Sequence, residues 1–181
     1  VTGLKADCLV EPFFSEYIEG SSWNKALEIY NPNDQAFSLE HCWVEIYSNG
    51  STEVGYSVAL SDVVPGGETH VLCNDRMDEN ETGRCDILEN SLIFNGDDAV
   101  ALICGGAGDD QERRIADVIG QVGNDPGSSW GSGILSTKNA TLRRDCGVVI
   151  GDDVKDDAFT PAESFVGEEI DVFDGLGTHC D

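Results

Sequence analysis

Apolar and polar residues alternate along most of this chain, and the alternation predicts β-strands rather than helices. The clearest instance is a pair of extended runs, 14–19 and 25–30, separated by turn residues at 20–22. In the second run Leu27 and Ile29 lie on one face, and their neighbours lie on the other, because successive side chains of a strand point to opposite sides. We therefore expect a β-hairpin at the centre of the fold.

Similar runs recur about every 8–14 residues, with Gly, Pro, Asn and Asp between them, and no stretch has sustained helical periodicity. In one run Cys42, Val44 and Ile46 alternate with polar and aromatic residues. This pattern predicts a single all-β domain over residues 1–181, a β-sandwich of Greek-key type. The further strands expected are 8–14, 37–48, 52–60, 69–73, 92–94, 99–104, 114–122 and 141–144, and one helical turn is expected at 161–165. In the strand 114–122, Asp117 is expected on the same face as Ile115 and Ile119.

The acidic composition limits which classes of partner the chain can bind. The chain has 35 acidic and 10 basic residues, a net charge of −25, so a nucleic-acid backbone would be repelled. The partners expected of such an acidic chain are cations, above all Ca²⁺, or a cationic polymer or a mineral surface. The alternative is that the negative charge only keeps the protein soluble in salty surroundings. No run of 18 apolar residues is present, so no membrane span is expected. Val1 could be a mature N-terminus left after removal of a signal peptide.

Cysteines and sequons indicate the compartment. None of the seven cysteines forms a C-x₂-C pair, which argues against zinc and thioredoxin-type sites. Together with N-x-S/T sequons at Asn49, Asn80 and Asn139, they favour a secreted or cell-surface glycoprotein. Cys73 and Cys85 bracket an acidic loop and are the best candidates for a disulfide. Seven thiols leave at least one without an internal partner, and the inward alternation of Cys42 makes it the residue we expect to be unpaired.

Six segments in order resemble the lamin-tail domain, in the version that precedes the catalytic domain of secreted bacterial nucleases. They are FSEYIEGSSWNKALEIYNP, LEHCWVEIYSNGS, FNGDDAVAL, ADVIGQVGNDPGSSWG, TLRRD and FDGLGTH, and the resemblance runs from about Phe13 to His179. The resemblance implies an immunoglobulin-like β-sandwich. It also implies an extracellular accessory role for a stand-alone domain, and not a nuclease activity, since catalysis in those nucleases lies in a separate downstream domain.

Acidic residues in apolar strand sequence are the candidate metal ligands. A hairpin with adjacent carboxylates can offer the oxygen ligands that Ca²⁺ prefers. The alternative is that the strand acids form ion pairs with Lys25, Arg143 and Arg144, because buried carboxylates need partners. The candidate ligands are Glu16, Glu19, Glu28, Asp97, Asp98 and Asp117.

No catalytic constellation is evident. His41 and Cys42 are adjacent in a strand and point to opposite faces, and no G-x-S-x-G motif occurs. His179 could meet Asp174, or could simply fasten the C-terminus. We therefore expect a secreted, non-enzymatic, Ca²⁺-binding interaction module, with an extracellular protein, a glycan or a mineral surface as partner. The alternatives are an accessory domain of a nuclease- or phosphatase-type hydrolase, whose longer precursor would continue beyond residue 181, and a carbohydrate-binding module that uses exposed residues among Trp23, Trp43 and Trp130.

Overall fold

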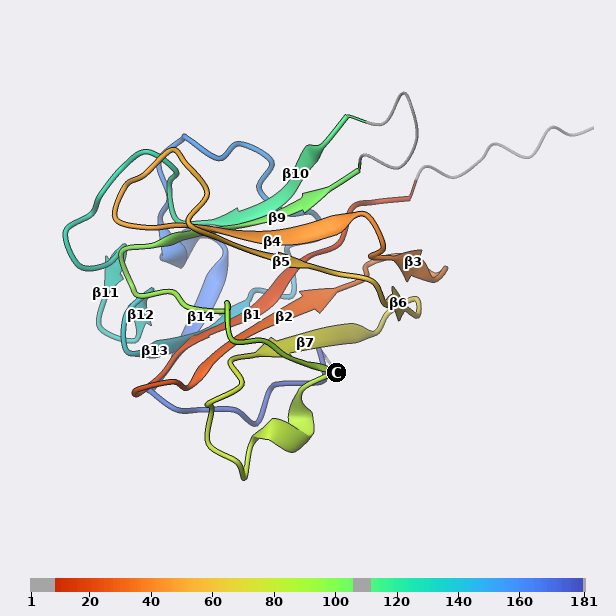
Figure 1. Ribbon diagram of the computed structural model, residues 1–181, viewed down its shortest axis with the longest axis horizontal. Helices are drawn as coiled ribbons and strands as arrows, with labels where there is room; N and C mark the ends of the chain where they lie inside the picture. Colours follow the sequence, from red (N-terminus) through yellow and green to blue (C-terminus); the bar gives the residue numbers. More distant parts are fainter. Residues whose placement is uncertain (1–8, 106–111, 181) are drawn as a thin grey trace, which may run out of the picture.

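The computed structural model describes residues 9–105 and 112–180, and its main elements are two β-sheets (Figure 1). The larger sheet has the order β14-β13-β1-β2-β7-β8, and the smaller has the order β10-β9-β4-β5. Within these ranges all pairings are antiparallel except that of β7 with β8. The chain is all-β, as the alternation predicts, and the two sheets are compatible with a β-sandwich. The immunoglobulin-like, Greek-key topology stays a prediction.

The bounds of the elements are as follows. The larger sheet consists of β1 (Phe13–Glu19), β2 (Lys25–Tyr30), β7 (Thr69–Cys73), β8 (Ile87–Leu88), β13 (Ala140–Arg144) and β14 (Phe165–Glu168). The smaller consists of β4 (Cys42–Tyr47), β5 (Tyr56–Ala59), β9 (Ala99–Cys104) and β10 (Arg114–Ile119). The short elements are β3 (Phe37–Ser38), paired with β6 (Val63–Val64), β11 (Gly131–Ser132), paired with β12 (Leu135–Ser136), and the 3-10 turns η1 (Thr82–Arg84) and η2 (Pro161–Glu163).

The main core lies between the two sheets. Leu27 and Ile29 from β2 meet Val44 and Ile46 from β4 there, all fully buried. This is the set of inward positions that strand alternation predicts. Both outer faces are also partly covered, so polar residues on them are buried as well. Tyr17 illustrates the inner packing, since its ring centroid lies 5.0 Å from that of Phe94.

Some predicted strands differ in extent. Residues 92–94 form no strand, although Leu92 and Phe94 are fully buried, because an apolar run can also be a buried loop. The expected strand 52–60 is reduced to β5, and the expected strand 8–14 begins only at Phe13 as part of β1. In β10 a register shift lies between Ile115 and Asp117. The prediction that Ile115 and Ile119 share a face is therefore wrong, since a bulge reverses the alternation.

Candidate functional site

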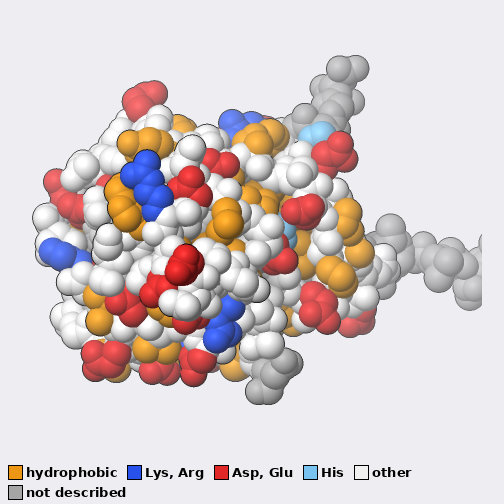
Figure 2. Space-filling model, turned by 60° about the horizontal axis from the view of Figure 1, so that its bottom comes forward, with side chains coloured by type: hydrophobic (Ala, Val, Ile, Leu, Met, Phe, Trp, Pro, Cys, Tyr) orange, Lys and Arg blue, Asp and Glu red, His pale blue; other side chains and the backbone are white. Residues whose placement is uncertain are grey.

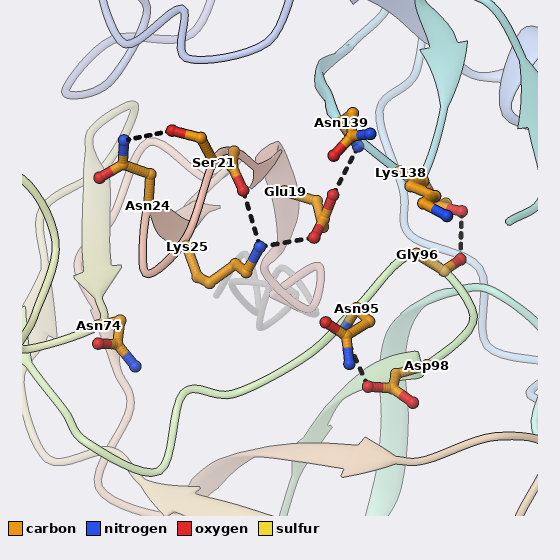
Figure 3. A network of polar contacts seen from close by, with 12 residues as sticks. Glu19, Ser21, Asn24, Lys25, Asn74, Asn95, Gly96, Asp98, Lys138 and Asn139 are labelled. Atoms are coloured by element: carbon orange, nitrogen blue, oxygen red, sulfur yellow. Dashed lines mark hydrogen bonds and ion pairs between the residues drawn. The ribbon is translucent and has the colours of Figure 1, made fainter. Parts of the chain in front are cut away.

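Glu19 and Lys25 form the first cluster of candidate residues, at the ends of β1 and β2 that flank the hairpin turn (Figure 3). The Lys25 ammonium donates to Glu19 Oε1 at 2.5 Å and to the Gly20 carbonyl at 2.8 Å. The other oxygen, Glu19 Oε2, accepts from the Asn139 amide at 2.5 Å. Both side chains are about 7% exposed. Glu19 therefore ties the hairpin to the turn before β13.

Asp117 lies at the junction of the two sheets and is fully buried. One carboxylate oxygen accepts from the Phe14 amide of β1 and from the Arg144 guanidinium. The other accepts from the amides of Val118 and Asp152. Burial raises the pKa of Asp117, while Arg144 and the amides of Asp152 and Phe14 act in the opposite direction. This carboxylate is a structural link between β10, β1 and β13.

Asp98 also serves the backbone. Its two oxygens accept from the amides of Asn49 at 3.0 Å and Asn95 at 2.8 Å, so it joins the turn after β4 to the turn before β9. Burial raises the pKa of this carboxyl. The neighbouring Asp97 is only partly buried. The acidic hairpin turn singled out in the sequence thus places one carboxylate inward and one toward solvent.

Glu16 and Glu28 are the most perturbed pair. They face each other across β1 and β2 and are 2% and 0% exposed. Burial raises the pKa of Glu16 to about 8, although Arg143 opposes the shift, and it raises the pKa of Glu28 to about 7. Glu28 has polar partners, Ser15 Oγ at 2.7 Å and the Gly177 amide at 2.6 Å. Glu16 Oε1 is buried without a hydrogen bond among the described residues.

A C-terminal segment, residues 171–180, lies over these glutamates. Its Gly177 amide binds Glu28, and Asp174 pairs with Arg143, which also lies 3.5 Å from Glu16. The end of the segment is fastened by the Cys146–Cys180 disulfide. The segment therefore excludes water from a protonatable carboxylate pair.

The six candidate metal ligands are thus not brought together. They divide among the hairpin end, the sheet junction, the β9 turn and the covered pair. No group of three or more His, Cys, Asp or Glu side chains in the described ranges is placed to hold a metal ion. The ion-pair alternative is realised for two of them, Glu19 with Lys25 and Asp117 with Arg144. Arg143 lies 3.5 Å from Glu16, but burial raises the pKa of that carboxyl to about 8, and Arg143 pairs with Asp174. Ca²⁺ binding stays a prediction.

A cavity of about 320 Å³ opens beside the tip of the β1–β2 hairpin. The sequence singled out Trp23 by residue type, but could not show that residues 93–95 lie against it. Figure 3 shows Lys25 above the loop that carries Asn95. The cavity is lined by Ser22, Trp23, Lys25, Ile93, Phe94 and Asn95.

A second cavity, of about 420 Å³, lies beside β10 and includes Glu11, Arg114 and Ile150 in its lining. Of its three charged lining residues, Glu11 and Arg114 pair with each other at 2.5 Å, and Asp153 is the third. The polar groups of this cavity are therefore less free to meet a ligand.

Six cysteines form three disulfides in the described part of the chain. The predicted Cys73–Cys85 bond is confirmed. The prediction that Cys42 is unpaired is wrong, because it is bonded to Cys104. Cys42 does face inward, 2% exposed, but the sequence did not reveal that β4 pairs with β9 and places Cys104 directly opposite. Cys8 lies outside the described residues.

The remaining candidates are distributed over the surface and the core. Asn49, Asn80 and Asn139 are all exposed, as N-glycosylation would require. His179 packs against the rings of Tyr30 and Phe13, with centroids 4.5 and 5.8 Å away, while Asp174 pairs with Arg143 instead. The C-terminal histidine therefore anchors the end of the chain.

No family description, no curated protein and no solved structure matches this chain. The resemblance to the lamin-tail domain, and the accessory role it implies, therefore stay proposals. In the ranges 9–105 and 112–180, no helix has the length and apolar character needed to cross a membrane.

Proposed function

We propose that this chain is a secreted, non-enzymatic interaction module whose acidic surface engages Ca²⁺ or a cation-bearing partner. The observation that carries the proposal is that few basic side chains are left to balance the acidic surface. There are 10 basic residues against 35 acidic ones, an excess of 25 negative charges. Among residues 9–105 and 112–180, six basic side chains already pair with carboxylates: Lys25, Arg84, Arg113, Arg114, Arg143 and Arg144.

Such an excess creates a negative field that concentrates cations at the surface. In Figure 2 Asp and Glu side chains are spread over the visible face, and Lys and Arg are fewer. Ca²⁺ binds carboxylate oxygens, and extracellular modules bind it with dissociation constants of about 10⁻⁴–10⁻³ M. The three disulfides are consistent with an oxidising extracellular setting, where Ca²⁺, mineral surfaces and cationic proteins occur.

Equilibrium dialysis of the disulfide-intact chain against Ca²⁺ tests the proposal. At roughly 0.15 M NaCl the Debye length is about 8 Å, so diffuse accumulation of ions around the protein is strongly screened. We expect saturable excess Ca²⁺ on the protein side under these conditions, and Ca²⁺-dependent adsorption to calcium carbonate particles. An excess that disappears in this salt, together with no adsorption, would leave only a solubilising charge and would reject the proposal.

A further inference from the structure

The hairpin tip is held in place by two segments that are distant in sequence. Asp171 accepts hydrogen bonds from the Ser21 amide at 2.9 Å, the Ser21 hydroxyl at 2.6 Å and the Asn24 side chain at 3.0 Å. The Asp78 amide donates to Asn24 Oδ1 at 3.0 Å. Ser22 has a positive φ of 55°, which gives the tip a defined turn. Trp23 is therefore presented by an ordered backbone, which lowers the entropic cost of binding through it.

Trp23 is one of the large apolar side chains left exposed, at 38%. The Arg76 guanidinium lies 4.6 Å from its ring centroid, a cation–π contact that restrains the indole. An isolated exposed aromatic needs no explanation. This one, however, borders the cavity of about 320 Å³, which is the size of the smaller ligand sites in proteins.

The cavity combines apolar and polar lining. The partly buried Ile93 contributes apolar surface above the fully buried Phe94, and the exposed Asn95 brings a side-chain amide with both donor and acceptor groups. Lys25 is held in place by Glu19 and the Gly20 carbonyl, and these two contacts use two of the three donors of its ammonium group. Polar groups fixed in this way can orient a ligand rather than merely solvate it.

The charges around the cavity define the class of ligand. Anions are repelled by the net charge of −25. A cation would find no acidic side chain among the lining residues, and the charge of Lys25 is already balanced by its pair with Glu19. A neutral ligand remains, and it must offer both an apolar face for the indole and several hydroxyl groups for the amide and ammonium donors. A pyranose ring has these properties.

We propose that the hairpin-tip cavity binds a neutral sugar ring, with Trp23 as the stacking platform and Asn95 and Lys25 as hydrogen-bonding groups. The other tryptophans do not offer such a site. Trp130 is only 7% exposed. Trp43 has a similar contact with Arg113, but it is less exposed than Trp23 and is not among the residues that line this cavity. The inference is independent of cation binding by the acidic surface, since none of the cavity-lining residues is acidic.

Glycan-array binding by the disulfide-intact chain, in EDTA, tests the inference. We expect binding to neutral glycans and not to sialylated or sulfated ones. With the best neutral oligosaccharide in calorimetry, Trp23→Ala should weaken binding at least about tenfold, because stacking on an aromatic ring is lost. Trp43→Ala, a tryptophan on the other sheet, should leave it unchanged. Because EDTA removes Ca²⁺, this result is separate from the outcome of the dialysis experiment.

Three results would overturn the inference: no binding to any neutral glycan, preference for charged glycans, or equal affinities of Trp23→Ala and the parent chain. If Trp23→Ala lowers the melting temperature, Asn95→Ala is measured instead. Asn95 is exposed, so its replacement removes hydrogen-bonding groups without opening the core. Unchanged affinity in that variant would equally reject the site. Binding of neutral nucleosides in preference to sugars would reject the saccharide assignment.

Discussion

The buried carboxylates define the chemistry of this molecule at the residue scale. Five of the six acids singled out in the sequence are buried: Glu16, Glu19, Glu28, Asp98 and Asp117. The sequence could predict that they are unusual, because charges in apolar strands are costly. It could not predict their partners, since Asn139, Phe14 and Gly177 approach them through tertiary contacts. The ion pair of Lys25 with Glu19 across a hairpin was the easiest to anticipate.

The Glu16–Glu28 pair makes stability depend on pH. Burial raises the pKa of Glu16 to about 8 and that of Glu28 to about 7, so the folded state holds protons that the unfolded state releases. The contribution is therefore most favourable below about pH 4.5 and is lost as the pH rises through 7 and 8. We expect Glu16→Gln to be more stable than the parent at pH 8.5, by about 1.4 kcal/mol for each unit by which folding raises the pKa, and to show little difference at pH 4.5.

Urea unfolding at several pH values measures this effect. Glu40→Gln, at an exposed position in the loop before β4, is the matched control and should follow the parent chain at every pH. Parallel pH profiles for Glu16→Gln and the parent would show that the pair does not hold the extra protons.

The buried Asp117–Arg144 pair should contribute far more to the free energy of unfolding than the exposed Glu11–Arg114 pair. Arg144 is 2% exposed at its side chain and stacks on Phe165, with its guanidinium 4.2 Å from the ring centroid. Arg144→Met leaves Asp117 buried without its counter-charge, which typically costs about 3–5 kcal/mol. Arg114→Met removes an arginine that is 60% exposed in its pair with Glu11, so we expect a loss of at most about 1 kcal/mol. Denaturant unfolding compares the two, and equal losses would contradict a structural role for the buried pair.

At the element scale, the C-terminal segment 171–180 is the piece that a strand pattern cannot reveal. It contains no strand, yet it binds the hairpin tip through Asp171, the glutamate pair through Gly177 and β13 through Asp174. The alternation in β4 was a reliable signal because one apolar face of this strand meets the core. β9 was predicted as a short apolar run after a turn, and both of its faces are buried. Residues 92–94 were wrongly predicted as a strand, since periodicity cannot separate a short buried loop from a strand.

The Cys146–Cys180 disulfide should hold this segment in place. In the chain-entropy argument a loop closed over a sequence separation of 34 residues is worth roughly 3–4 kcal/mol. We expect the paired change Cys146→Ser with Cys180→Ser to speed amide hydrogen exchange at Gly177, whose N–H bonds to Glu28. The control change Cys42→Ser with Cys104→Ser breaks the disulfide between β4 and β9 of the smaller sheet and should leave that amide protected. Equal exchange rates at Gly177 in both variants would contradict a specific anchoring role.

At the scale of the whole molecule, net charge opposes the compact fold. A surface with 25 excess negative charges repels itself, and the three disulfides of the described ranges offset this by restricting the unfolded chain. The sequence was sufficient to predict the net charge and the all-β class. It was not sufficient for the pairing order, which places Cys42 beside Cys104 and β1 beside β13, because register and strand order depend on contacts between residues far apart in the chain.

Ca²⁺ should therefore stabilise the folded chain beyond the effect of ionic strength. Monovalent salt screens the repulsion between surface carboxylates, whereas a bound ion adds RT ln(1 + [L]/Kd), about 2.7 kcal/mol at 100 times Kd. Thermal melts in EDTA, in millimolar CaCl₂ and in NaCl of matched ionic strength distinguish the two effects. We expect the midpoint to be highest in CaCl₂. Asp97→Asn removes a partly exposed carboxylate from the β9 turn and probes one place where an ion could bind. Equal midpoints in CaCl₂ and matched NaCl would mean that the acidic surface is screened without holding Ca²⁺, and that the partner must be sought among cationic polymers.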